Sequence, residues 1–280
     1  MVPDYFPPWP SASEGYPSTM RSKTKAEYAK PPVVEVACGV LFDPLDIKLP
    51  HWGRFWEMLP DEFSEVQEAP PLASVVETAT ATFSTMTASG YVLPRIWFIS
   101  KAGDQLVQLQ RDRFLFNWRK TDPEHAYPRY ENVFRDFEET FAVFEKFVAE
   151  LKMAHVVARQ YELTYINHIP RDQTWTSLDE LGHVLPDLSW RPANGRDLPT
   201  PEAIDARFTF QLPNSAGRLH AHVQNGVLAD SRPVLLLDLT ARGYLEDRAA
   251  WFSLAHDWII GAFGDLTHPG IQESVWGLRK

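Results

Sequence analysis

Residues 131–151, ENVFRDFEETFAVFEKFVAEL, contain the strongest structural signal in the chain. Apolar side chains recur in this stretch at every third or fourth position, which places them along one side of a helix. Most of its charged side chains fall outside that stripe. The pattern therefore predicts a long amphipathic helix that packs along its length against another element. The stripe consists of Val133, Phe134, Phe137, Phe141, Phe144, Val148 and Leu151.

The segments before this helix are mainly strand-like. Residues 33–42, VVEVACGVLF, are apolar and rich in β-branched side chains, which is typical of a buried strand. A short helix is expected at residues 51–59, because a proline stands on either side of them. Residues 78–87, rich in threonine and alanine, indicate an edge strand. Three antiparallel strands are expected at residues 95–100, 105–110 and 113–119.

The same order of elements recurs in the second part of the chain. A strand is expected at residues 161–169, and the capping-box sequence Ser177–Glu180 predicts the start of a short helix. Residues 187–201, rich in Pro, Gly and Asn, indicate a loop, and residues 247–263 form the closing amphipathic helix. Three further strands are expected at residues 206–212, 218–224 and 233–240.

These two series predict an α+β protein made of two similar β-α-β(3)-α halves, with antiparallel sheet and the long helices packed on one face. Ala102 stands eight residues before Gln110, and Ala216 stands eight before Gln224, each followed by glycine. A long helix begins at a similar distance after each glutamine, which favours an internal duplication. The sequence leaves open whether the halves form one continuous sheet or two packed sheets.

Composition divides the chain into three parts. Residues 1–30 are rich in proline and carry scattered aromatic side chains, so we expect an extended or disordered arm, or a strap docked on the body or a partner. Residues 31–155 form the first half and residues 156–280 the second, and we expect them to make one compact unit. His51, Trp52, Phe55 and Trp56 form an aromatic cluster that is a candidate ligand platform, but helical spacing favours a core role for Trp52, Phe55 and Trp56.

The bulk properties limit the partners and the location. A net charge of −10 disfavours nucleic acids and anionic membranes, because both attract basic proteins. The sequence contains neither a secretory signal nor about 20 consecutive apolar residues that would span a bilayer. The single cysteine, Cys38, has no disulfide partner within the chain, which fits a reducing compartment. The expected location is therefore the cytoplasm.

Five segments carry a family resemblance, and the most specific motif, QLQRDRFLFNWRK, lies within the segment Leu106–Lys120. The others are Pro31–Leu45, His51–Trp56, Tyr127–Tyr130 and Leu163–Ile169. They resemble a sporadically distributed family of uncharacterised bacterial proteins, over about Pro31 to Trp276. The resemblance implies a bacterial cytosolic protein and, through the patchy distribution, an association with defence or toxin-related loci. It implies no cofactor and no catalytic residue.

The basic stretch Arg111–Lys120 is the best candidate for a ligand or anion site. On a strand, Arg113, Asn117 and Arg119 share one face with Leu115, while the aromatic side chains between them form the core face. Arginine offers a bidentate fork to an anion, a nucleotide or an acidic partner. The alternative is a solvated face whose arginines pair with nearby carboxylates. The candidate residues are Arg111, Arg113, Asn117 and Arg119.

His220 and His222 are weaker candidates, as metal ligands. They are two apart on a predicted strand and therefore point the same way, but zinc needs at least one more ligand and no supporting motif accompanies them. Cys38 lies in a predicted buried strand, where a thiol is inert. We find no Gly-x-Ser-x-Gly, Walker or dinucleotide-binding motif, and we expect no cofactor.

Three functions follow as hypotheses. The first is a non-enzymatic binding protein that contacts a protein partner or a second copy of itself, because the chain has ten tryptophans and no catalytic pattern. The second is a small-molecule or nucleotide sensor or carrier that binds at the junction of the halves or on the arginine-rich strand. The third is a metal-dependent enzyme that uses His220 and His222 with a carboxylate.

Overall fold

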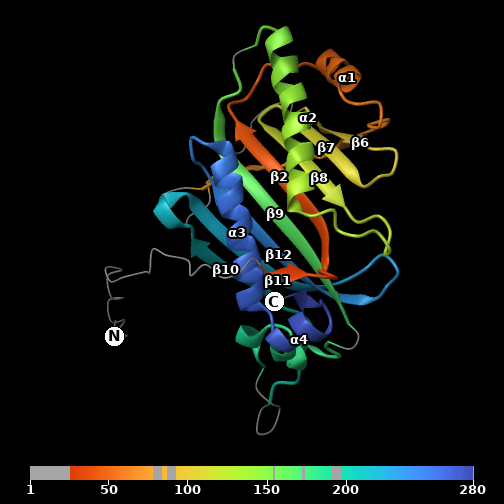
Figure 1. Cartoon of the computed structure of the whole chain (residues 1–280), viewed down its shortest axis with the longest axis vertical. Helices are drawn as coiled ribbons and strands as arrows, with labels where there is room; N and C mark the ends of the chain where they lie inside the picture. Colours follow the sequence, from red (N-terminus) through yellow and green to blue (C-terminus); the bar gives the residue numbers. More distant parts are fainter. Residues whose placement is uncertain are drawn as a thin grey trace.

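Nine antiparallel strands form the centre of the protein in the computed structural model, which describes residues 26–77, 84–86, 93–153, 155–171, 174–190 and 197–279 (Figure 1). Their order across the sheet is β10-β11-β12-β9-β2-β8-β7-β6-β3. The prediction of an α+β protein with antiparallel sheet is confirmed. The strands are β2 (Val33–Phe42), β3 (Glu65–Ala69), β6 (Arg95–Ile99), β7 (Gln105–Gln110), β8 (Arg113–Arg119), β9 (Ala158–Pro170), β10 (Asp205–Gln211), β11 (Gly217–Val227) and β12 (Pro233–Gly243).

Strands from the two parts of the chain occupy separate sides of one continuous sheet. On one side β2 is followed by β8, β7, β6 and β3, and on the other side β9 is followed by β12, β11 and β10. The two series meet where β2 pairs with β9 in antiparallel orientation, with Val36 opposite Tyr165 and Val40 opposite Tyr161. The sequence left open whether the two halves form one sheet or two, and in the structure they share one nine-stranded sheet.

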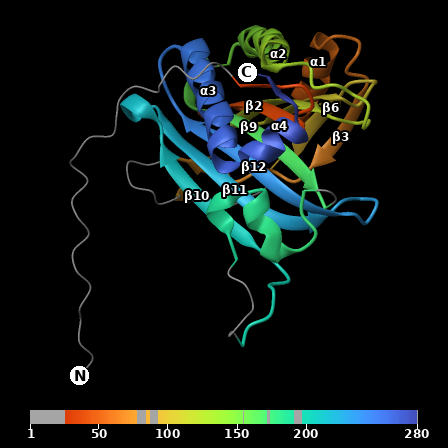
Figure 2. The ribbon, with the colours of Figure 1, turned by 60° about the horizontal axis from the view of Figure 1, so that its bottom comes forward.

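The long helices cover one face of this sheet (Figures 1 and 2). Helix α2 (Tyr130–Glu150) lies over β8 and β2, and α3 (Arg248–Leu266) lies over β12 and β9. A shorter helix, α1 (Leu49–Met58), packs beside α2. All three elements were expected from the sequence. Helix α3 begins at the predicted place because the Asp247 carboxylate accepts a hydrogen bond from the Ala250 amide at 3.0 Å.

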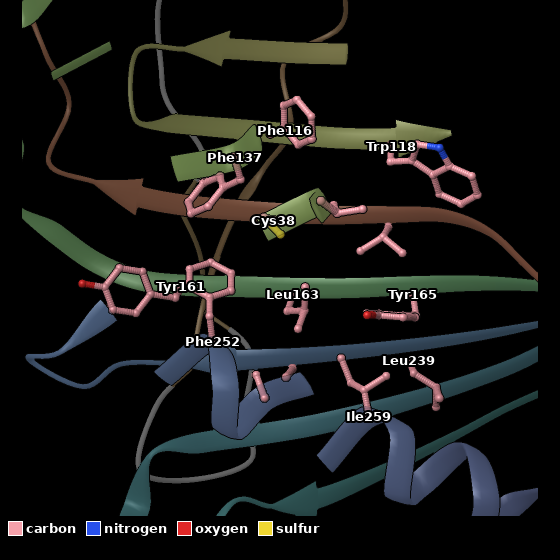
Figure 3. Packing of buried hydrophobic residues seen from close by; sticks show 14 of the residues in the cluster. Cys38, Phe116, Trp118, Phe137, Tyr161, Leu163, Tyr165, Leu239, Phe252 and Ile259 are labelled. Carbon is pink, nitrogen blue, oxygen red and sulfur yellow. The ribbon is translucent and has the colours of Figure 1, made fainter. Parts of the chain in front are cut away.

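The core lies between the helices and this face of the sheet (Figure 3). Strand β8 contributes Phe114, Phe116 and Trp118, as its alternation predicted. Phe144 of α2 is fully buried, and its ring centroid lies 5.3 to 5.4 Å from those of Phe42 and Phe114. These contacts fasten α2 to the two neighbouring strands β2 and β8.

The edge of the sheet differs from the sequence-based expectation. The edge strand there is β3, which the sequence did not indicate and which pairs with β6. The expected strand at residues 78–87 lies largely outside the described residues. Its described part, β5 (Ser84–Met86), pairs with β4 (Ser74–Val76) in a separate two-stranded sheet. The chain leaves the main sheet after β3 because Pro70 and Pro71 follow it, and proline cannot continue a hydrogen-bonded ladder.

The expectation of a capping box at Ser177 needs correction. Ser177 precedes a 3₁₀ helix, η1 (Leu178–His183), and its side chain does not cap the helix, because its hydroxyl instead donates to the Asp179 carboxylate. The Glu180 carboxylate accepts hydrogen bonds from Thr176 and not from the Ser177 amide. The chain after α3 forms α4 (Pro269–Ser274) and β13 (Leu278–Arg279), and Trp276 between them is buried.

The end of the predicted arm is docked on the body. Strand β1 (Glu27–Tyr28) pairs with β13, and the Tyr28 ring packs edge-on against Phe263 and Trp276. Residues 1–25, which make up most of the predicted arm, lie outside the described residues.

Candidate functional site

The face of the sheet opposite α2 and α3 is polar, and we refer to it as the polar face. It arises from strand alternation, because side chains on either side of each core residue point away from the helices. Arg113 and Asn117 therefore share this face on β8, as the sequence predicted. The same alternation adds polar side chains from the neighbouring strands. They include Glu35, Gln108, Gln110, Gln160, Glu162, Arg218, His220, His222, Asp238 and Arg242.

A segment that we call the strap, residues 70–77, crosses the polar face after β3. Three side chains of the face, Gln110, Arg113 and Gln160, form hydrogen bonds to its backbone at 2.8 to 3.1 Å. Their partners are backbone groups of Leu72, Ala73, Val75 and Glu77. Gln110, Arg113 and Gln160 are consequently buried, although each lies on the side of the sheet away from the helices.

The candidate arginines have three different environments. Arg113 is only 6% exposed. Arg119 is half-buried and donates a hydrogen bond to the Gly103 carbonyl at 3.0 Å. Arg111 lies in the β7–β8 turn, is exposed, and donates to the Leu45 carbonyl at 3.1 Å. The structure therefore places Arg113 on the polar face beneath the strap, and it places Arg111 outside that face.

Asn117 belongs to a buried chain of hydrogen bonds. Its amide nitrogen donates to the Glu35 carboxylate at 2.5 Å, and its carbonyl oxygen accepts from Gln108 at 2.7 Å. Burial raises the pKa of Glu35, and the hydrogen bond from Asn117 opposes that effect. Asn117 therefore serves to fix Glu35, and both of its polar atoms are already engaged.

Asp238 is the least satisfied carboxylate of the polar face. Its Oδ1 atom is buried without a hydrogen-bond partner, and burial raises the pKa of the group, partly offset by His222. Glu35 lies close enough for the two negative charges to repel each other. Two carboxyl groups with raised pKa values thus face the same region, which makes both of them readier to hold a proton than ordinary surface carboxylates.

His220 and His222 both point to the polar face, as their spacing predicted. The His220 Nε2 atom lies 2.6 Å from one oxygen of Glu77 in the strap, and Arg218 donates to the other oxygen at 2.9 Å. Burial raises the pKa of Glu77, but these two hydrogen bonds outweigh it and leave the pKa lowered. His222 lies 3.0 Å from the carboxylate of Asp205.

Each histidine thus contacts a different carboxylate. Within the described ranges, no three His, Cys, Asp or Glu side chains come together at metal-binding distance. Cys38 is completely buried in the core, and burial raises the pKa of its thiol, so it is placed as the sequence predicted (Figure 3). Among the described helices, none is long and apolar enough to cross a membrane.

A second site, the α1 groove, lies on the other face, between α1 and the edge strand β3. It has a volume of about 320 Å³. Trp52 and Phe55 are buried, as the sequence indicated, but Trp56 is 41% exposed, and its indole nitrogen donates to the Phe63 carbonyl at 2.6 Å. The expectation that all three aromatic residues belong to the core is wrong for Trp56. The groove is lined by Leu49, Trp52, Gly53, Trp56, Val66, Gln67, Glu68, Ile96 and Phe98.

Sequence reasoning missed β3, the strap and Arg95 on β6. The alternation of Arg95 with Trp97 was a usable signal for Arg95, since it marks both residues as lying on one face of the strand. Comparison of the chain with protein-family models, with curated proteins and with solved structures gives no match.

Proposed function

We propose that this protein is a binding protein that takes an extended segment of a protein partner along the free edge of β3, beside the α1 groove. The observation that carries the proposal is a sheet edge and an exposed apolar cluster at the same place. Strand β3 ends the sheet and pairs only with β6 among the described strands. An edge strand presents unpaired amide and carbonyl groups, which an added strand satisfies.

The apolar part of the site supports side-chain recognition. Leu49, Trp56 and Val66 are 53%, 41% and 41% exposed, and all three line the α1 groove. Large exposed apolar side chains that gather in one place mark interaction surfaces, and tryptophan is the residue that contributes most often to binding energy there.

The negative charge around the groove favours a partner segment with basic residues. Five acidic residues surround β3 and the end of α1, and all of them are exposed. A partner segment that alternates apolar with basic residues therefore fits best, because its basic side chains face this rim while its apolar side chains enter the groove. The acidic residues are Glu57, Asp61, Glu62, Glu65 and Glu68.

The test is selection of a displayed library of random 12-residue peptides on the full chain, followed by affinity measurement. We expect selected peptides to alternate apolar and basic residues, to bind more weakly as salt rises, and to lose about tenfold or more in affinity with Trp56→Ala. Trp190→Ala is the matched control, because Trp190 is 37% exposed and lies far along the chain from the groove. Peptides that bind Trp56→Ala as well as the parent would exclude this site.

A second copy of the chain is the competing occupant. Pairing of β3 with β3 would appear in sedimentation as a dimer that Trp56→Ala dissociates, and this result would replace the peptide proposal with self-association.

We also infer that the two halves descend from one duplicated unit. The matching strand orders β2-β8-β7-β6 and β9-β12-β11-β10, each followed along the chain by a long helix, support that inference.

A further inference from the structure

Two arginines on the polar face lie close together, and within the described part of the chain no carboxylate is bound to either. Arg95 begins β6, and Arg113 begins β8. The register places Ile96 opposite Leu109, so Arg95 lies beside Gln110, which in turn pairs with Arg113. The three side chains therefore form one row across β6, β7 and β8 on the polar face.

The hydrogen-bonding capacity of both guanidinium groups is largely unused. Arg113 donates one hydrogen bond, to the Ala73 carbonyl of the strap at 3.1 Å, and its Nε atom is buried without a partner. The Nε atom of Arg95 is also buried without a partner, and its guanidinium lies over the Trp97 ring at 5.3 Å from the centroid. Burial lowers the pKa of both arginines, and the charge of Arg113 lowers that of Arg95 further.

The nearby charges leave an excess of positive charge. Arg113 interacts electrostatically with Glu162, Asp112 and Arg242. Glu162 is already engaged by Arg242 at 2.6 Å, and Asp112 accepts a hydrogen bond from Gln110. Among the described residues, three arginines therefore face two carboxylates in this region, and the positive charge of Arg95 and Arg113 exceeds what those two carboxylates neutralise.

The adjoining segment of the chain supplies no further counter-ion. Residues 78–94, TATATFSTMTASGYVLP, contain no aspartate or glutamate. Glu77, immediately before them, is held by Arg218 and His220. That contact shows how the polar face binds a carboxylate, because a side-chain nitrogen lies against each oxygen. Arg95 and Arg113 offer a comparable pair of donors, and no carboxylate of the described residues lies bonded to either of them.

We propose that Arg95 and Arg113 bind the carboxylate or phosphate group of a small molecule on the polar face, beside the strap. Guanidinium groups match the paired oxygens of both anions, and a buried cation gains most from an anion that it contacts directly. The Gln110 side chain, bonded to the strap on one side and to Asp112 on the other, holds the row in place between the two arginines. This site is separate from the α1 groove.

The experiment measures the melting temperature and the titration heat of the full chain in low-salt HEPES with inorganic phosphate, with succinate, and with sodium chloride at matched ionic strength. We expect phosphate or succinate to stabilise the protein more than chloride does. Stabilisation by phosphate alone assigns a phosphorylated ligand, and stabilisation by succinate alone assigns a carboxylic acid. Equal effects of all three salts would overturn the proposal, because ionic strength then explains them.

Two variants locate the effect. Arg95→Gln should weaken binding of the effective anion about tenfold to a hundredfold, because it removes charge-assisted hydrogen bonds. Arg232→Gln is the matched control, since Arg232 is exposed and pairs with Asp230. Without added anion, Arg95→Gln should melt no lower than the parent, because the substitution removes a charge that lacks a counter-ion. A lower melting temperature together with an unchanged anion response would show a structural role and refute the site.

Discussion

Phe144→Ala tests whether one aromatic residue fastens α2 to the sheet. Phe144 is fully buried, and its ring centroid lies 5.3 to 6.3 Å from those of Phe42, Phe55, Phe114, Phe141 and Phe147. Replacing a buried phenylalanine by alanine costs about 3–5 kcal/mol, because apolar burial is lost and a cavity remains. Each aromatic contact adds about 0.5–1.5 kcal/mol beyond its buried area, which places Phe144 in the upper part of that range.

The assay is urea unfolding of the full chain, followed by far-ultraviolet circular dichroism. We expect the free energy of unfolding to fall by about 4–5 kcal/mol. In a thermal scan the same loss lowers the melting temperature by roughly 10 °C for a chain of this size. Phe210→Ala is the matched control, because Phe210 is 39% exposed on β10 and should lose about 1 kcal/mol or less. Equal losses for the two variants, or a loss below about 2 kcal/mol for Phe144→Ala, would contradict the packing argument.

Three further predictions concern titratable groups. Burial raises the pKa of Asp238, so folding penalises its ionised form. The protein therefore loses stability as the pH rises through the pKa that Asp238 has in the folded state. Asp238→Asn should unfold at higher urea concentration than the parent at pH 7 and at the same concentration in acid. The pKa of Glu77 is lowered, so its contribution is present above the unfolded pKa and lost as pH falls. Glu77→Gln should speed exchange of the residue 77 amide hydrogen, which bonds Gln160, and an unchanged rate would argue against this contact. Cys38 should resist a thiol reagent at pH 8 until urea unfolds the chain, whereas native reactivity would place it elsewhere.

Local patterns were enough to predict the elements that form the core. The stripe of α2 and the apolar run of β2 repeat with the periods of helix and strand, and the structure places both within a residue of the expected ends. Strand β3, EVQEA, has no such pattern, because four of its five residues are exposed. Its extended form comes from pairing with β6, a contact that no local sequence feature encodes.

The candidate sites were predictable only in part. The face shared by Arg113 and Asn117 follows from alternation, but their burial does not, because the strap that covers Arg113 comes from a segment about 40 residues earlier in the chain. Arg95 became a candidate only when the register placed it beside Gln110 and Arg113. Trp56 lies at the expected helical position, yet it is exposed, because it lines the α1 groove and is not enclosed in the core.

The central pairing of β2 with β9 has a consequence for synthesis on the ribosome. Strand β2 ends at Phe42, but its partners β8 and β9 end at Arg119 and Pro170. At about 5–20 residues per second, the apolar strand β2 waits on the order of ten seconds before both neighbours exist. Throughout that interval the apolar strand β2 lacks at least one of its two neighbours, so we expect nascent chains that stop before Pro170 to engage chaperones or to aggregate.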